Sequence, residues 1–515
     1  MKKVFAFIQT PSGIVLTIIL ILSAFLRLYK IADYMTFLGD EGRDVLVVRD
    51  ILMGHLTLLG PRASAGDFYT GPIYYYFMAP FLWLFNYDPV GPAVMIALLG
   101  IITVFLTFYI GRKFFGVNAG LIAAALYAVS PLVIAYSRSS WNPNPMPFFS
   151  LVILLVLYNA LKNKSWKYFV SVGVLFGIAF QLHYIEVAFG VVIGFFLAVG
   201  TIVEEKTKRF LSLLARFSLL IGGFIVGYSP FLAFEVRHGF PNLRTIFNFV
   251  FSKDLSSGYV THQSFFSTVA DVFFRLFSRL VMQLPSPGFS GTSRLIWDGL
   301  TLILAVLSVA FLFKVKNKLA VVMFAAWLFF GVVLFGFYKK PIYDYYFEFM
   351  FPLPFLLVGN FLGQLTLVKF WHKFMLSLSV VLFLVLFLIN FAGMPFRYAP
   401  NKQKDQMKDI AQFVLSKTDG KAFNFALLAH GNSDHAYRYF FAVAGKDPVT
   451  IENVAVDPKR TTVTGQLLVV CEYADCKPLG NSLWEIAGFG RAEIAGHWHV
   501  SVVDVYRLTH YHGSK

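Results

Sequence analysis

Two neighbouring carboxylates, Asp40 and Glu41, follow the first apolar segment of the chain, with Arg43 and Asp44 close behind. A carboxylate can act as a general base and take a proton from a hydroxyl group. Charged side chains near lipid are costly unless they have a partner or a function. These residues are therefore expected to have a function or a partner at the membrane surface. The alternative is a solvated loop in which Asp40 only caps the following helix.

A second polar group could bind an anion. Arg138 lies in a short loop with serines on both sides and Asn142 nearby, and a guanidinium group can grip a phosphate with two hydrogen bonds. Lys339 and Lys340 are the second candidates for the same task. Their alternative is a pair of interfacial lysines that extend their charges toward water.

Further polar and aromatic residues between apolar segments are candidates for substrate contacts. His183 at the end of an apolar segment could instead be a hydrogen-bonded packing residue. Asp344 could pair with one of the two lysines or face a bound acceptor, and the sequence leaves both open. The expected substrate contacts are Arg43, Asp67, Tyr74, Asn142, His183, Tyr184 and Asp344.

The composition defines the class of protein. Hydrophobic residues make up 57% of the 515 residues and charged residues 14%, and the mean hydropathy is +0.66. A soluble domain is nearer a quarter charged, so the chain is expected to be a polytopic membrane protein. Its net charge of +16 is attributed to basic loops that fix membrane topology rather than to nucleic-acid binding.

The apolar segments predict about eleven membrane spans, because each span needs about 20 mostly apolar residues. The segment 71–85 is short and contains Pro72 and Pro80, and we expect it to lie in the membrane interface. The first segment is expected to be a retained anchor. The predicted spans are 11–29, 89–111, 117–136, 146–161, 167–183, 186–203, 211–235, 296–314, 319–337, 349–368 and 374–392.

The charges between these spans predict their orientation. With eleven spans, the basic loops near residues 112–113, 162–167, 206–209, 314–318 and 369–373 all fall on one side. Positive loops face the cytoplasm, so this side is predicted to be inside. The loops 30–88 and 236–295 and the C-terminal tail are then predicted to lie outside.

The composition changes after about residue 395, which divides the chain into a membrane domain of residues 1–395 and a soluble domain of residues 396–515. The tail predicts a small extracytoplasmic α/β domain, with helices at 408–416 and 434–444 and strands at 422–428, 466–471 and 500–506. Cys471 and Cys476 lie in this tail, and a disulfide between them is plausible in an oxidising compartment. His497 and His499 alternate on an expected strand and are interpreted as surface residues.

The order of these motifs resembles the GT-C glycosyltransferases, in particular bacterial relatives of protein O-mannosyltransferases and of the aminoarabinose lipid A transferase. The resemblance rests on Asp40–Glu41 after the first span, the segment Gly71-Pro72-Ile73-Tyr74-Tyr75, and the polar loop 138–145. In place of the family's Asp-Pro, that loop has Asn142-Pro143 and Asn144-Pro145, which weakens the case for a metal there.

The resemblance implies that the chain is a cell-membrane glycosyltransferase which moves a hexose or pentose from a polyprenyl-phosphate donor to an acceptor hydroxyl, with inversion, outside the cytosol. The acceptor could be a lipid, a protein or a cell-wall polymer. Asp40, with Glu41 beside it, would be the catalytic base, and Arg138, Lys339 and Lys340 would bind the donor phosphate. No cofactor is certain and a divalent metal is possible. Membrane lipid is also expected as a partner, because the chain is predicted to be a membrane protein.

Two other classes of function remain open at this stage. A transporter or lipid flippase predicts polar residues and helix breaks in the middle of the spans, whereas the charges here lie mainly at span ends. A membrane-anchored ligand-binding protein would explain the tail, but it would not explain eleven spans or Asp40.

Overall fold

The computed structural model describes residues 7–63, 68–205, 207–251, 264–283, 291–338, 340–368 and 371–511. The chain forms two compact units. The first comprises Met1–Tyr29, Thr57–Phe77 and Val94–Ala399, and the second comprises Lys30–Leu56, Met78–Ala93 and Pro400–Lys515. Residues 30–56, which the sequence analysis assigned to the membrane domain, thus belong to the compact unit of the tail.

Apolar helices dominate the first unit. Within the described residues, eight are long and apolar enough to cross a membrane, and a ninth is possible if a pair bent by 53° counts as one span. The pair is η3 (Asp344–Met350) with α18 (Pro352–Leu365). The eight are α2 (Pro11–Leu28), α6 (Val90–Phe115), α9 (Met146–Asn163), α11 (Val187–Glu204) with the turn η1 (Tyr184–Glu186), α12 (Arg209–Gly227), α16 (Thr292–Leu312), α17 (Lys318–Val333) with η2 (Leu334–Phe337), and α19 (His372–Ala392).

Three shorter apolar helices complete the set. They are α5 (Ile73–Leu84), α7 (Val117–Val129) and α10 (Trp166–Phe180). Each of the eleven expected spans therefore coincides with an apolar helix, and the polytopic helical fold is confirmed. The expected eleven spans are reached if the bent pair η3–α18 and the short helices α7 and α10 also cross the membrane.

Proline residues divide the helices in two of the expected spans. α7 ends before Pro131, where α8 (Pro131–Tyr136) begins, and Ser130 between them is extended. α12 ends at Gly227, and α13 (Ser229–His238) starts with Pro230 in its first turn. Proline has no N–H to donate and disfavours a helical residue before it, so each of the expected spans 117–136 and 211–235 contains a break that the sequence analysis did not assign.

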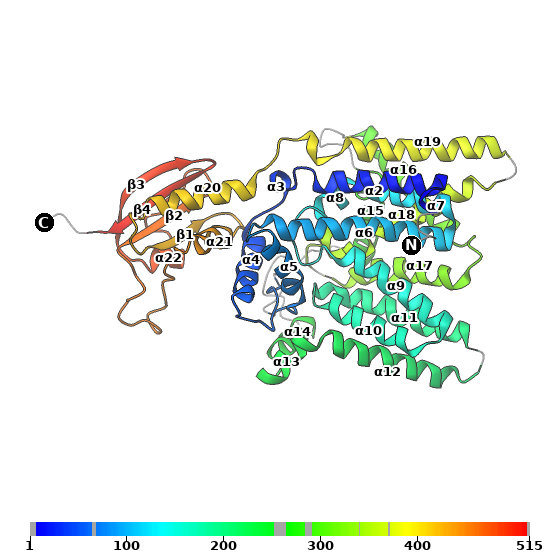
Figure 1. Ribbon diagram of the computed structural model, residues 1–515, viewed down its shortest axis with the longest axis horizontal. Coiled ribbons are helices and arrows are strands. Elements are labelled where there is room, and N and C mark those ends of the chain that lie inside the picture. The colour runs from blue at the N-terminus through cyan, green and yellow to red at the C-terminus, as the bar shows by residue number, and fades with distance from the viewer. Residues whose placement is uncertain are drawn as a thin grey trace. The chain divides into compact units, whose positions relative to one another are not determined.

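Small residues let the helices of the first unit approach closely. A Cβ atom at Gly173 of α10 would lie 2.0 Å from the carbonyl oxygen of Leu220 in α12, and one at Gly223 would lie 2.2 Å from the carbonyl oxygen of Val170. α10 and α12 consequently lie side by side (Figure 1). Without a hydrophobic driving force between helices in lipid, such close contact supplies much of their association.

The predicted inner loops gather at one end of this helical unit. Lys113 donates to Asn159 at 2.8 Å, and Lys162 pairs with Glu204 at 2.8 Å. Asn317 donates to the hydroxyl of Tyr158 at 2.7 Å. These contacts join the ends of α6, α9, α11 and the start of α17, so the basic loops between them lie together.

The expected outer loop 236–295 contains helices that the sequence analysis did not assign. They are α13, which extends to His238, α14 (Pro241–Phe251) and α15 (Phe265–Ser278). Ser264 begins α15, because its hydroxyl accepts a hydrogen bond from the backbone N–H of Ser267 at 3.2 Å. The apolar side chains of α15 recur with helical spacing, as in Phe266, Val269 and Phe273.

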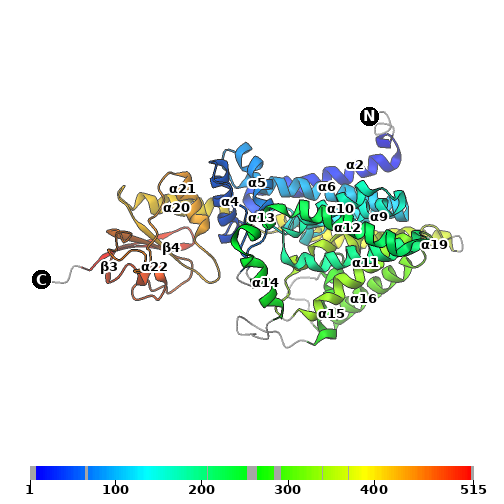
Figure 2. The ribbon, with the colours of Figure 1, turned by 90° about the horizontal axis from the view of Figure 1, so that it is seen from below.

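The second unit contains a four-stranded sheet in the order β1-β2-β4-β3, with all four strands labelled in Figure 1. Figure 2 shows β3 and β4 of this sheet from below. β1 (Asn424–Leu428) runs parallel to β2 (Gln466–Cys471), and β4 (Val503–His510) is antiparallel to both β2 and β3 (Ala492–Val500). The strand expected at 466–471 is present with the same bounds, those expected at 422–428 and 500–506 are present within four residues at each end, and β3 holds His497 and His499. Cys471 and Cys476 form a disulfide with their Cα atoms 6.0 Å apart.

Helices cover this sheet because its strands are apolar on both faces. Phe425 of β1 packs against Phe441 of α21 (His435–Val443), with ring centroids 5.0 Å apart. Ala426 and Leu428 point to the opposite face and join a core with Ile486 of α22 (Trp484–Ala487). The remaining helices of this unit are α3 (Ile31–Tyr34), α4 (Gly39–Leu52) and α20 (Gln403–Ser416), and α20 begins five residues before the helix we expected.

Candidate functional site

The two carboxylates after the first span open helix α4. Glu41 is buried and its Oε2 accepts a hydrogen bond from the backbone N–H of Leu38 at 3.0 Å, so Glu41 caps the helix rather than Asp40. The Asp40 side chain is 57% exposed and pairs with Arg43 at 2.9 Å. Arg43 also donates to the fully buried Asp44 through two nitrogens, at 2.9 and 2.8 Å. Asp40 therefore presents an open carboxylate whose charge is balanced by a fixed guanidinium group.

Burial changes the ionisation of the second carboxylate. Loss of hydration raises the pKa of Glu41 to about 7, and the nearby charges of Asp40 and Asp44 act in the same direction. The hydrogen bond from the Leu38 N–H opposes this effect. Glu41 thus titrates near neutral pH, whereas Asp40 keeps its access to water and to a reactant.

Helix α4 lies against α21 of the same unit because of two glycines. A Cβ atom at Gly42 would lie 2.3 Å from the backbone nitrogen of Ala436, and one at Gly39 would lie 2.1 Å from the hydroxyl oxygen of Ser433. Any larger residue at either position would push the helix away. The glycines on both sides of Asp40–Glu41 therefore fix the distance between the carboxylates and the tail.

Arg138 lies in the first unit, where it is 2% exposed. Its Nη1 donates to the carbonyl oxygen of Leu26 at 2.7 Å, and its Nη2 donates to that of Tyr29 at 2.8 Å. The guanidinium group also lies 4.8 Å from the ring centroid of Phe396. Both terminal nitrogens that a forked phosphate contact needs are thus engaged with the C-terminal end of α2, which they cap.

The other expected contacts of the first unit are mostly buried. Asn142 donates to the carbonyl oxygen of Leu182, and the Tyr74 hydroxyl lies 2.7 Å from that of Ser140. The backbone N–H of Ile185 donates to His183 Nδ1 at 3.4 Å, the packing role that the sequence analysis left open.

Aromatic rings join several of the predicted outer loops of this unit. Tyr184 packs edge-on against Phe68, with ring centroids 5.6 Å apart, and its hydroxyl lies 3.0 Å from that of Tyr338. His183 lies 5.7 Å from the ring of Tyr345. Asp67 and Lys339 lie outside the described residues. Lys340 is half-buried.

A polar pocket of about 480 Å³ lies at these loops. Its centre is Asp344, whose Oδ1 accepts from Arg275 Nε at 3.1 Å and whose Oδ2 accepts from Arg279 Nη1 at 2.5 Å. Arg275 is nearly buried, while the Arg279 side chain is 45% exposed. The lining residues are Tyr136, Trp141, Arg275, Arg279, Ile342, Tyr343, Asp344 and Tyr345. An exposed guanidinium beside stacked aromatic rings can bind an anion and an adjacent sugar ring.

Sequence reasoning named Asp344 and the Trp141 loop but missed the two arginines of this pocket. Arg275 and Arg279 are four residues apart and therefore lie on one face of a helical stretch. The apolar spacing of residues 265–278 indicates this helix, but the sequence analysis assigned these residues to the outer loop 236–295.

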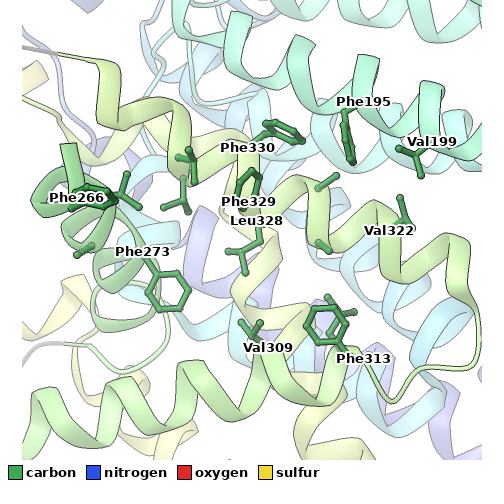
Figure 3. Close-up of a pocket in the computed structure, with 17 residues that line it drawn as sticks. Phe195, Val199, Phe266, Phe273, Val309, Phe313, Val322, Leu328, Phe329 and Phe330 are labelled. Carbon is green, nitrogen blue, oxygen red and sulfur yellow. The ribbon is translucent and has the colours of Figure 1, made fainter.

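A larger cavity of about 800 Å³ has an entirely apolar lining (Figure 3). It lies among α11, α15, α16 and α17, and α15 contributes Phe266, Val269, Ala270 and Phe273. On a helix these positions face away from Arg275 and Arg279. The same helix thus borders an apolar cavity on one face and the polar pocket on the other.

In the part of the chain that the structure describes, no three or more His, Cys, Asp or Glu side chains are placed to hold a metal ion.

Residues 69–226 match the family model of dolichyl-phosphate-mannose-protein mannosyltransferases. No curated protein sequence matches the chain. Among solved structures, ArnT from Cupriavidus metallidurans bound to undecaprenyl phosphate is similar, with a TM-score of 0.63 and 13% identity over 97% of this chain and 98% of that one.

Two other solved structures are similar over most of this chain. The oligosaccharyltransferase AglB from Archaeoglobus fulgidus, in complex with an inhibitory peptide and a dolichol-phosphate, gives a TM-score of 0.51 and 14% identity over 90% of this chain and 70% of that one. The arabinofuranosyltransferase AftD from Mycobacteria gives a TM-score of 0.53 and 13% identity over 96% of this chain and 39% of that one. The fold is therefore that of the GT-C glycosyltransferases, and the resemblance expected from the sequence is confirmed.

Proposed function

We propose that this chain is a membrane glycosyltransferase that moves a sugar from a polyprenyl-phosphate donor to an acceptor hydroxyl. The GT-C fold supports the class of reaction, and the ArnT and AglB structures contain undecaprenyl phosphate and dolichol-phosphate. The observation that carries the proposal is the environment of α15. This helix presents arginines to a polar pocket and phenylalanines to an apolar cavity, the two kinds of surface that a lipid phosphate requires.

The donor phosphate is assigned to Arg279, with Arg275 behind it, in place of Arg138. Arg279 is partly exposed and lines the pocket, whereas the donors of Arg138 serve the end of α2. Asp344 holds both arginines in place and limits their net charge, so the phosphate can leave after the reaction. Trp141 and Tyr345, with ring centroids 4.2 Å apart, offer an aromatic surface for the sugar.

Asp40 is assigned as the general base. The acceptor oxygen attacks the anomeric carbon from the face opposite the phosphate, the bond from that carbon to the phosphate oxygen breaks, and the acceptor proton passes to the Asp40 carboxylate. Configuration at the anomeric carbon inverts, and the lipid phosphate departs as an anion stabilised by a guanidinium group. Glu41 supports this role by capping α4 and is not itself exposed to the acceptor.

The proposal includes the side of the membrane on which the reaction takes place. We place the reaction at the extracytoplasmic surface of the cell membrane, because the basic loops gather at the opposite end of the helical unit and positive loops face the cytoplasm. Lys339, Lys340 and Asp67 remain candidates for donor or acceptor contacts, as the sequence analysis proposed. The acceptor class is a lipid, a protein or a cell-wall polymer.

The test is a transfer assay with purified protein in lipid vesicles and a radiolabelled polyprenyl-phosphate sugar. Asp40→Asn keeps the shape but loses proton acceptance, so transfer should fall by ~10²–10⁴-fold with donor binding unchanged. Asp50→Asn is the matched control, because Asp50 is a 53% exposed acid on the same helix. Transfer at the normal rate by Asp40→Asn would show that Asp40 is not the general base. Absence of transfer by the wild type with every polyprenyl-phosphate sugar tested would contradict the proposed function.

A further inference from the structure

A hydrogen-bond chain within the second unit links the carboxylate helix to the tail. The backbone N–H of Gly39, the residue before Asp40, donates to Asn432 Oδ1 at 3.0 Å. Asn432 Nδ2 in turn donates to both carboxylate oxygens of Glu472, at 3.0 Å each. The hydroxyl of Tyr437 donates to Glu472 Oε1 at 2.8 Å. The first turn of α4 is thus connected to a carboxylate more than 400 residues away in the sequence.

The sheet fixes the position of Glu472, which is the last residue of this series of hydrogen bonds. Glu472 follows directly after β2, and its backbone N–H donates to the carbonyl oxygen of Leu428, the last residue of β1, at 2.9 Å. The disulfide between Cys471 and Cys476 closes the loop that begins at Glu472. Glu472 therefore starts from the carboxyl end of β2, and Asn432 lies in the loop four residues after the end of the paired parallel strand β1.

Asn432 and Gly39, which join the series of hydrogen bonds to α4, have little freedom to move. Asn432 Oδ1 also accepts the backbone N–H of Ser433 at 2.9 Å, so the amide orientation is set by donors on both of its sides. Gly39 lies so close to Ser433 that even a Cβ atom would collide. A change at Asn432 cannot be absorbed by a small movement of α4 toward α21, and it should shift the turn that carries Asp40.

We propose that Asn432 and Glu472 are positioning residues for the Asp40 carboxylate, so that the tail sets the geometry of the general base. This inference rests on the proposed role of Asp40. Neither residue needs to touch a substrate. Their effect passes through the Gly39 amide, and a displacement of about 1 Å of a catalytic group can reduce a rate by roughly a hundredfold.

The first experiment tests the hydrogen bond between the Gly39 N–H and Asn432 and needs no substrate. Hydrogen exchange of the full-length protein in detergent is followed in peptides that cover residues 37–44. Asn432→Ala removes the acceptor for the Gly39 N–H, so exchange in this segment should become roughly tenfold faster. Glu493→Ala is the control, because Glu493 is an exposed acid on β3 of the same sheet. Unchanged exchange in Asn432→Ala would overturn the proposal even if the protein transfers sugar.

The second experiment separates positioning from overall stability through kinetics. With a polyprenyl-phosphate sugar, Asn432→Ala and Glu472→Ala should lower kcat by about 10- to 100-fold while the donor KM stays within twofold. Glu472→Gln keeps a carbonyl oxygen for Asn432 and Tyr437, so kcat should recover in part. Normal kcat in Asn432→Ala despite faster exchange would overturn the positioning role. A wild type that transfers no sugar would instead contradict the proposed function, and the exchange result would stand by itself.

Discussion

Arg279 reaches from α15 to Asp344 and places its Nη1 2.5 Å from Oδ2 of that carboxylate. The arginine is 45% exposed while the aspartate is 9% exposed. The buried acid therefore fixes the direction of a guanidinium group whose residue lines the polar pocket. A fixed and partly solvated arginine is better prepared to bind a phosphate than a lysine, whose single ammonium cannot make a forked contact.

Arg279→Ala is expected to raise the donor KM by roughly 10- to 100-fold, because a hydrogen bond to a charged group contributes about 1.5–3 kcal/mol. Arg279→Lys should be impaired as well, since a single ammonium cannot replace the planar group. The measurement is donor binding and transfer in lipid vesicles. Arg294→Ala is the control, as Arg294 pairs with Asp298 at the exposed start of α16. An unaltered donor KM in Arg279→Ala would show that the donor phosphate binds at another place.

Arg138→Ala is expected to act on stability rather than on the donor. It leaves the carbonyl oxygens of Leu26 and Tyr29 without their buried donor, which should cost about 1–3 kcal/mol for each group affected. Thermal unfolding in detergent should show a lower Tm, with the donor KM within twofold of wild type. Arg397→Ala is the control, because exposed Arg397 donates to a single carbonyl, that of Ala392. A normal Tm together with lost donor binding would restore the phosphate role that the sequence suggested for Arg138.

The helical fold could be predicted because lipid imposes long apolar segments, and these are visible one by one in the sequence. The breaks at Pro131 and Pro230 were also visible, but they depend on how much irregularity neighbouring helices tolerate. Helix α15 escaped notice because an amphipathic helix of 14 residues has no span-length apolar run. Its arginines were consequently not considered as candidates.

The candidate site was harder to predict, because residue type does not reveal what a side chain contacts. Arg138 and Arg279 are both arginines outside predicted spans, yet one caps a helix and the other lines a pocket. Asp40 and Glu41 are adjacent, yet only Glu41 is buried. The link from Gly39 to Asn432 joins residues 393 positions apart, and no local pattern could indicate it.

The buried Glu41 should make the protein less stable as the pH rises through neutrality. Its folded pKa of about 7 lies above its ordinary value of 4.5. The stabilising contribution of its protonated form is therefore complete below about pH 4.5 and is lost as the pH rises through 7. The full difference corresponds to about 3 kcal/mol. Tm measured between pH 5 and 8.5 should fall in the wild type and stay flatter in Glu41→Gln. Asp50→Asn is the control and should follow the wild type, because Asp50 is an exposed acid on the same helix. An identical pH dependence in Glu41→Gln and wild type would contradict the assignment.

The membrane orientation can be tested by cysteine labelling in intact cells with a membrane-impermeant maleimide. The native cysteines are joined in a disulfide and will not react. Leu56→Cys and Val502→Cys place thiols at positions that are 74% and 61% exposed, and both should be labelled from outside.

Lys316→Cys is the matched control for that experiment. Lys316 lies in one of the basic loops that gather at one end of the helical unit, so its cysteine should react only after the membrane is permeabilised, because positive loops face the cytoplasm. Labelling of Lys316→Cys in intact cells, with Val502→Cys protected, would reverse the orientation and place the proposed sugar transfer on the cytoplasmic face. Protection of Leu56→Cys alone would separate the Asp40 helix from the outer surface and would leave the acceptor hydroxyl without its proposed base.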